Sequence, residues 1–105
     1  MTSIVFYRKD GLLYGFEMSG HSGYAKHGED IVCSALSSAA YMTANTITDV
    51  LMLKADITVD DAKLSLELNG SSIIKAHDIL QGFYLHINQL REQYPQFIKA
   101  QVTEV

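Results

Sequence analysis

The residues best suited to chemistry in this chain of 105 residues are its only cysteine, Cys33, and a histidine that precedes it, His21. A long stretch without charge follows Asp30, which predicts that Asp30 is a helix N-cap and that Cys33 occupies the N3 position, in the first turn. The free amides and the positive dipole end of a helix favour a thiolate over a thiol. A histidine that reaches the sulfur adds a general base, which meets the requirement for nucleophilic attack on an acyl group.

Each of these residues also has a purely structural interpretation. A lone cysteine in a small protein is most often buried and inert, and a loop histidine often only bonds to the backbone. Asp30 either orients His21 as a third catalytic residue or only caps the helix, and we favour the cap because its carboxylate suits the amide of Cys33. Taken together, Cys33, His21 and Asp30 favour a reactive thiol paired with a histidine. These residues alone do not identify the reaction or the substrate.

The sequence around the cysteine also resembles a known family. Gly20-His21, then Gly28, then Asp30-Ile31-Val32-Cys33 followed by small residues is similar to the signature of the ribosomal-processing cysteine protease family (Prp). The chain length and the order of predicted elements resemble that family as well. Ser34 stands where alanine is expected to be commoner, which adds a hydroxyl beside the cysteine and removes no catalytic group.

The resemblance implies a cysteine endopeptidase that removes the N-terminal extension of a bacterial large-subunit ribosomal protein. It implies Cys33 as the nucleophile and His21 as the general base, in a cytoplasmic homodimer, and we expect no cofactor and no metal. The stretch from Gly20 to Glu29 has no hydrophobic period, which predicts a loop able to move over a bound substrate. We therefore expect substrate contacts from five residues: Gly20, Ser22, Gly23, Tyr24 and Gly28.

Composition limits the other classes of function. Eight basic and 12 acidic residues give a formal charge of −4, so direct binding to nucleic acid is not expected. A single cysteine cannot form an internal disulfide and is compatible with the cytoplasm. No apolar run is long enough to span a membrane, and the N-terminus does not read as a signal peptide. We expect one domain, residues 1–105.

The periodicity of the chain predicts an α+β fold with the order ββαββαβ. The predicted strands are 3–8, 12–19, 57–60, 63–69 and 97–105, and the predicted helices run from 30 to about 53 and from 71 or 72 to about 93. They should form a five-stranded, largely antiparallel sheet packed with two helices. The first helix lacks charge between Asp30 and Asp49, so we expect it to be buried by the sheet and by the second helix or another subunit.

Two other functions are open from the residues. A non-catalytic, ribosome-associated or anion-binding module would use the glycine-containing loop and the helix N-terminus, although the stretch lacks a P-loop sequence and Glu29 and Asp30 would repel an anion. A metal site built from His21, His27, Cys33 and a carboxylate has suitable ligand types, but its spacing matches no recognised zinc motif.

Overall fold

The computed structural model describes residues 1–20, 29–61 and 63–105. The elements are β1 (Thr2–Lys9), β2 (Leu12–Ser19), α1 (Glu29–Asn45), a π-helical turn η1 (Thr46–Val50), β3 (Asp56–Asp60), β4 (Lys63–Glu67), α2 (Ser72–Lys75), α3 (His77–Gln93) and β5 (Ile98–Glu104). The five strands form one sheet in the order β3-β4-β2-β1-β5. Every pairing is antiparallel except that of β1 with β5. The predicted α+β class and largely antiparallel five-stranded sheet are confirmed.

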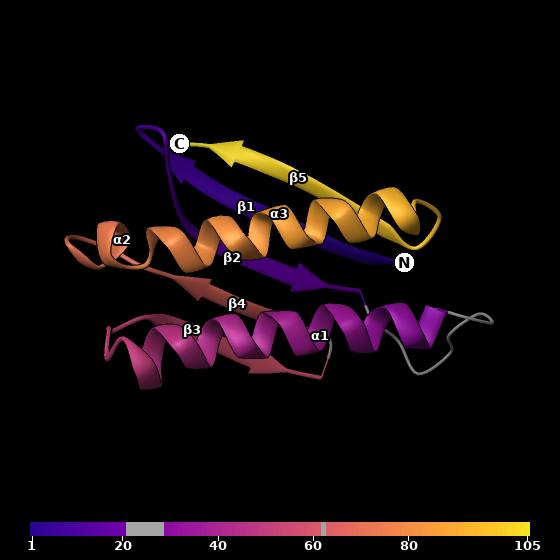
Figure 1. Ribbon diagram of the computed structural model, residues 1–105, viewed down its shortest axis with the longest axis horizontal. Coiled ribbons are helices and arrows are strands. Elements are labelled where there is room, and N and C mark those ends of the chain that lie inside the picture. The colour runs from indigo at the N-terminus through magenta and orange to yellow at the C-terminus, as the bar shows by residue number, and fades with distance from the viewer. Residues whose placement is uncertain (21–28, 62) are drawn as a thin grey trace.

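Both long helices lie on one face of this sheet and run side by side in opposite directions (Figure 1). The core fills the space between the two layers. From the strands come Ile4, Phe6, Leu13, Phe16, Met18, Leu64 and Leu66, and from the helices Val32, Leu36, Ala40, Leu80, Phe83 and Ile87. The buried positions of α3 follow the spacing of one helical face. No helix in the described part of the chain is long and apolar enough to cross a membrane.

The helices differ from the predicted ones at their ends. The first predicted helix ends its α-helical part at Asn45 and widens into η1, and the second is divided at Ala76. Near the first of these points the hydroxyls of Thr43, Thr46 and Thr48 donate to carbonyls four residues earlier. Such bonds disturb a regular helix, which accounts for a change of helix type where threonines are dense.

A polar network on the face of the sheet away from the helices ties β2 to its neighbours. The Tyr7 hydroxyl donates to Glu17 at 2.8 Å, and Lys63 Nζ lies 2.6 Å from the other carboxylate oxygen. Hydrogen bonds from Lys63 and then Tyr7 hold the pKa of Glu17 below its usual value. The same bond to Glu17 raises the pKa of Tyr7 to about 12. One carboxylate therefore links β1, β2 and β4.

We expect this network to make the fold less stable in acid. Because the folded pKa of Glu17 is lowered, its contribution is complete above the unfolded value of about 4.3 and is lost as the pH falls through the lower folded value. Urea unfolding at pH 7 and pH 3 should show a smaller loss of stability in acid for Glu17→Gln than for the unmodified chain. Glu92→Gln, on the exposed side of α3, is the control and should keep the full loss.

Candidate active site

The start of α1 carries Cys33, but not at the predicted position. The helix begins at Glu29, so Asp30 already lies inside it and is not the N-cap, and Cys33 is its fifth residue rather than N3. The Asp30 carboxylate accepts a hydrogen bond from the amide of Ile31 at 3.0 Å, not from that of Cys33.

This shift changes which amides are available for chemistry. The unpaired amides of a helix are those of its first four positions, which lie before Cys33. By position, the amide of Cys33 belongs to the helix's own hydrogen-bond ladder. Amides able to stabilise a developing oxyanion therefore come from the residues just before the cysteine, such as Asp30, although the amide of Ile31 is already bonded to the Asp30 carboxylate.

The Cys33 side chain lies beside the buried face of α1. Its free thiol is half-buried, and Val32 and Leu36 next to it are 3% and 0% exposed. Residues four apart share one side of a helix, so Ser37 and Tyr41 continue the flank that Cys33 begins. We call these three residues the Cys33 flank. Packing of the adjacent core face fixes the rotation of the helix and with it the direction of the thiol.

Gly20 ends β2 under a tight constraint. Its φ is +94°, and a Cβ at this position would lie 2.7 Å from the carbonyl oxygen of Met1. Both facts require glycine, because a side chain would meet backbone and the conformation is one that L-residues rarely adopt. The chain therefore leaves β2 in a fixed direction, immediately before His21. Nothing in the sequence predicts the contact between Gly20 and Met1.

The end of β2 and the start of α1 lie at the same end of the molecule (Figure 1). Across the sheet, Ser19 pairs with Ser3 on one side and with Lys63 on the other, so three strands hold the residue before Gly20. The structure thus brings Gly20, Asp30 and Cys33 to one end. The other predicted site residues, His21, Ser22, Gly23, Tyr24 and Gly28, lie outside the described residues.

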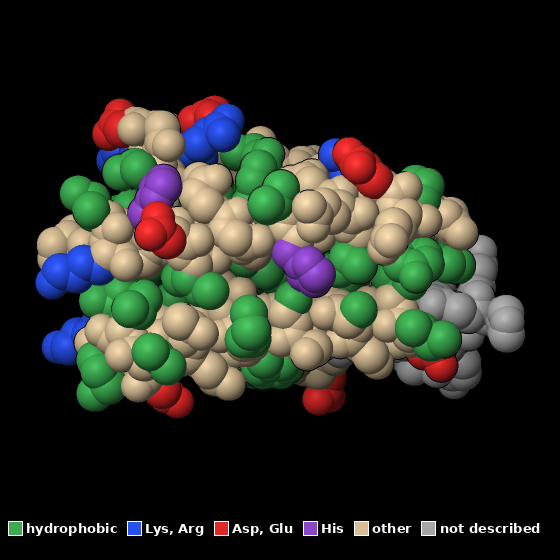
Figure 2. All heavy atoms as spheres, viewed as in Figure 1, with side chains coloured by type: hydrophobic (Ala, Val, Ile, Leu, Met, Phe, Trp, Pro, Cys, Tyr) green, Lys and Arg blue, Asp and Glu red, His purple; other side chains and the backbone are tan. Residues whose placement is uncertain are grey.

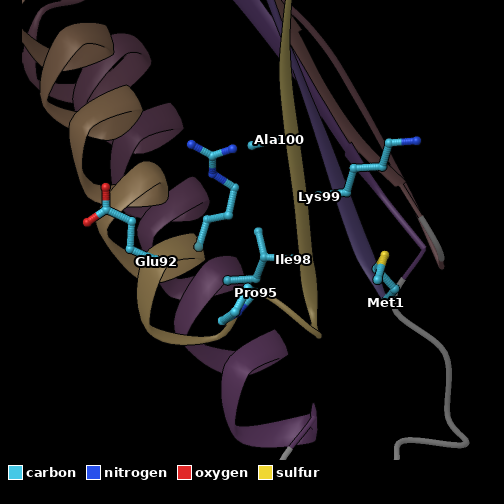
Figure 3. A pocket seen from close by; sticks show the side chains of 7 residues that line it. Met1, Glu92, Pro95, Ile98, Lys99 and Ala100 are labelled. Atoms are coloured by element: carbon cyan, nitrogen blue, oxygen red, sulfur yellow. The ribbon is translucent and has the colours of Figure 1, made fainter.

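A pocket of about 490 Å³ lies where α3 passes into β5 (Figure 3). Ile98 and Pro95 lie toward its inner side, whereas Lys99 points away on the far side of β5. Among the residues that the structure describes, its lining contains no cysteine or histidine. A second pocket, of about 510 Å³, follows the groove between α1 and α3 and is lined by Ala35, Met42 and Ile79 among others. Ala35 and Met42 belong to the flank of α1 opposite Cys33.

No group of three histidine, cysteine or acidic side chains is close enough to hold a metal within residues 1–20, 29–61 and 63–105. Two of the ligands considered for a metal site, His21 and His27, lie in the part that is not described. The metal alternative is therefore untested by the geometry.

The family of the chain follows from comparison with known proteins. A family model described as cysteine protease Prp matches residues 1–99. The chain belongs to this family. It is a cysteine peptidase, as the resemblance around Cys33 implied.

Relatives of the chain carry the same description. The ribosomal processing cysteine protease Prp of Mycoplasma pneumoniae is 31% identical over 81 residues, 76% of this chain and 78% of the relative. That of Bacillus subtilis is 24% identical over 88 residues, 78% of this chain and 79% of the relative. A crystal structure of a ribosomal processing protease Prp from S. aureus, in complex with a substrate peptide, covers 98% of this chain and 100% of its own at 23% identity, with a TM-score of 0.90. That likeness confirms the Prp fold.

We expect Gly20→Ala to damage both stability and turnover. The new Cβ meets the Met1 carbonyl and keeps a strained φ, which together should cost about 2–4 kcal/mol. Gly11→Ala is a matched control, since Gly11 has a φ of +80° but open space around its Cβ, and should cost only about 1–2 kcal/mol. Urea unfolding and peptide-cleavage assays of both variants measure the difference. If both substitutions lower stability and cleavage equally, the contact with Met1 does not constrain the site.

Proposed function

We propose that this peptidase removes the N-terminal extension of a bacterial large-subunit ribosomal protein in the cytoplasm. The observation that carries the proposal is the position of Cys33 near the start of α1, at the end of the sheet where β2 leads through Gly20 into His21, in a chain of the Prp family. Relatives named as ribosomal processing proteases support the substrate class.

The reaction follows from the chemistry of a thiol and an imidazole. His21 takes the proton of Cys33, and the thiolate attacks the carbonyl carbon of the scissile peptide bond. Amides at the start of α1 stabilise the oxyanion of the tetrahedral intermediate. Protonated His21 then donates its proton to the leaving amine, which breaks the C–N bond. Water, activated by His21, hydrolyses the thioester and regenerates the thiol.

Asp30 acts on the helix rather than on the histidine in this proposal. Its carboxylate already accepts the hydrogen bond from the amide of Ile31, and negative charge is favourable in the first turn of a helix. Gly20 fixes the direction in which the chain enters the site. The peptide contacts are assigned to the segment that follows, through Ser22, Gly23, Tyr24 and Gly28.

We expect Cys33→Ala to abolish cleavage of a peptide that copies the ribosomal extension, with little change in the melting temperature. His21→Ala should lower kcat/KM by about 10²–10⁴ through loss of the general base. His27→Ala, His77→Ala and His86→Ala are matched controls that should retain activity, and Ser34→Ala controls for substitution beside the nucleophile. Full activity in Cys33→Ala would end the assignment, and a comparable loss in a control histidine would move the base to that residue.

We also propose that the peptidase is a homodimer joined through the groove between α1 and α3. The groove is lined mainly by small and apolar residues, Ala35, Ala39, Met42, Ile79 and Phe83 among them. Hydrophobic and uncharged side chains follow the seam between the two helices, with a histidine among them (Figure 2), and His86 is part of the groove lining. Because α1 has no charged residue between Asp30 and Asp49, a copy related by a two-fold axis can pack against it without burying charge.

Sedimentation velocity tests the dimer. Met42 is 60% exposed at the groove, and Met42→Glu should give a monomer at a concentration where the unmodified chain is dimeric. Ile74, 70% exposed on α2 and outside the groove lining, is the control: Ile74→Glu should remain dimeric. A monomeric unmodified chain, or a dimer that survives Met42→Glu, contradicts the proposed interface.

A further inference from the structure

The edge strand β3 carries apolar side chains that the helices leave uncovered. Ile57 and Val59 pair with Leu66 and Leu64 of β4, so they point to the same face of the sheet as those leucines. Leu66 and Leu64 are 0% and 4% exposed under the helices, whereas Ile57 and Val59 are 39% and 54% exposed. We call Ile57 and Val59 the β3 shelf. It is an apolar surface on the same face of the sheet as the core, one strand beyond the strand that the helices bury.

The main chain of β3 is also open on one side. β3 is first in the strand order, pairs with β4 along its whole length, and has no strand on its other side within the described part of the chain. All five of its residues are exposed. An exposed strand edge presents backbone donors and acceptors that an extended peptide can pair with.

The β3 shelf lies on the side of α1 that carries the nucleophile. Of the two long helices, α1 lies toward the β4–β3 side of the sheet, whereas α3 contacts β2 and β5 (Figure 1). Ala35 and Met42 on α1 line the groove toward α3. The Cys33 flank is on the opposite side of the helix, so it faces the edge of the sheet that β3 forms.

One end of β3 also coincides with the end of the sheet that leads to the catalytic residues. Asp60 pairs with Lys63 of β4, and Lys63 pairs with Ser19 of β2. These three residues form one row across the sheet, and Gly20 follows Ser19 directly. A chain that lies along β3 and passes Asp60 is therefore led toward the start of α1.

We propose that the free edge of β3 binds the substrate as an added strand. An extended segment on one side of the scissile bond pairs its main chain with β3 and places alternate side chains on the β3 shelf. This inference rests on the proposed peptidase function and adds the place where the peptide docks. Main-chain pairing supplies affinity for any extended sequence, and the shelf selects apolar side chains at every second position.

The opposite face of β3 defines the intervening positions of the peptide. Asp56 pairs with Glu67 across β3 and β4, and both are exposed on the face away from the helices. Side chains of an added strand alternate between the two faces, so a position between the apolar ones lies beside the Asp56 carboxylate, with Glu67 one strand further in. The preferred segment therefore alternates apolar with basic residues, which suits a protein that binds RNA.

Hydrogen exchange of the Cys33→Ala protein tests the added strand without cleavage. With a synthetic peptide that copies the ribosomal extension and the residues after the cut, amides within 56–60 should exchange more slowly, while those of β5, the other edge, should not change. Two versions of the peptide should be compared, each N-methylated at alternate amides and offset from the other by one residue. The version whose methyl groups block the amides that pair with β3 should no longer protect β3 from exchange. Unchanged exchange in β3 at saturating peptide overturns the inference, and so does protection of β3 that depends on protein concentration without peptide, which would mean pairing of two copies.

Cleavage kinetics provide a second test of the docking site. The double variant Ile57→Ser with Val59→Ser should raise KM about tenfold, with kcat nearly unchanged, because apolar contact with the bound peptide is lost. Ile74→Ser and Leu85→Ser replace similarly exposed apolar residues elsewhere and should leave KM unchanged. Asp56→Asn should raise KM for a lysine-containing peptide and not for its glutamine version. Circular dichroism confirms that the variants fold.

The two arms separate this inference from the proposed function. Cleavage that needs Cys33 but is unaffected by the shelf variants and by Asp56→Asn overturns the docking site and leaves the peptidase in place. Protection of β3 by the peptide, in a chain that does not cleave it, supports the docking site and overturns the proposed substrate.

Discussion

The burial of one narrow face of α1 is the constraint on which the site depends. Leu36 and Ala40 of α1 are fully buried, as is Ile47 of η1, which continues the helix. Small residues elsewhere on α1 let its neighbours approach closely. A helix held along most of its length cannot rotate or slide without opening the core. Cys33 is one residue beyond this buried face, so its direction is set by packing that takes no part in the chemistry.

Much of the architecture could be predicted because local sequence patterns determine it. Asp10-Gly11 predicted a turn, and both residues have positive φ between β1 and β2. Alternation of Leu64 and Leu66 with polar neighbours predicted β4, and the stripe that includes Phe83 predicted α3. In each case one face of an element is buried against a continuous core, and the periodicity of the sequence records that burial directly.

The lateral arrangement could not be predicted in the same way. No local pattern states that β5 lies parallel to β1, or that β3 lies at an edge beside the flank that carries Cys33, because these depend on which elements meet after the chain has folded. The prediction put the first helical residue at Ile31, two residues later than Glu29, because Asp30 is as suitable in a first turn as at a cap. Gly20 could be singled out from its position, but its contact with Met1 requires the finished sheet.

The parallel pairing of β5 with β1 has a consequence for how the protein is made. Arg8 on β1 bonds to Glu104 on β5, 96 residues later in the chain, so one edge of β1 stays open while everything between them is synthesised. Contacts of such long sequence separation form late and slow folding. Met1, whose carbonyl lies against Gly20, directly precedes β1. A nascent chain therefore holds the cysteine before it holds a sheet rigid enough to direct the histidine, and the peptidase gains its geometry only after translation of nearly the whole domain.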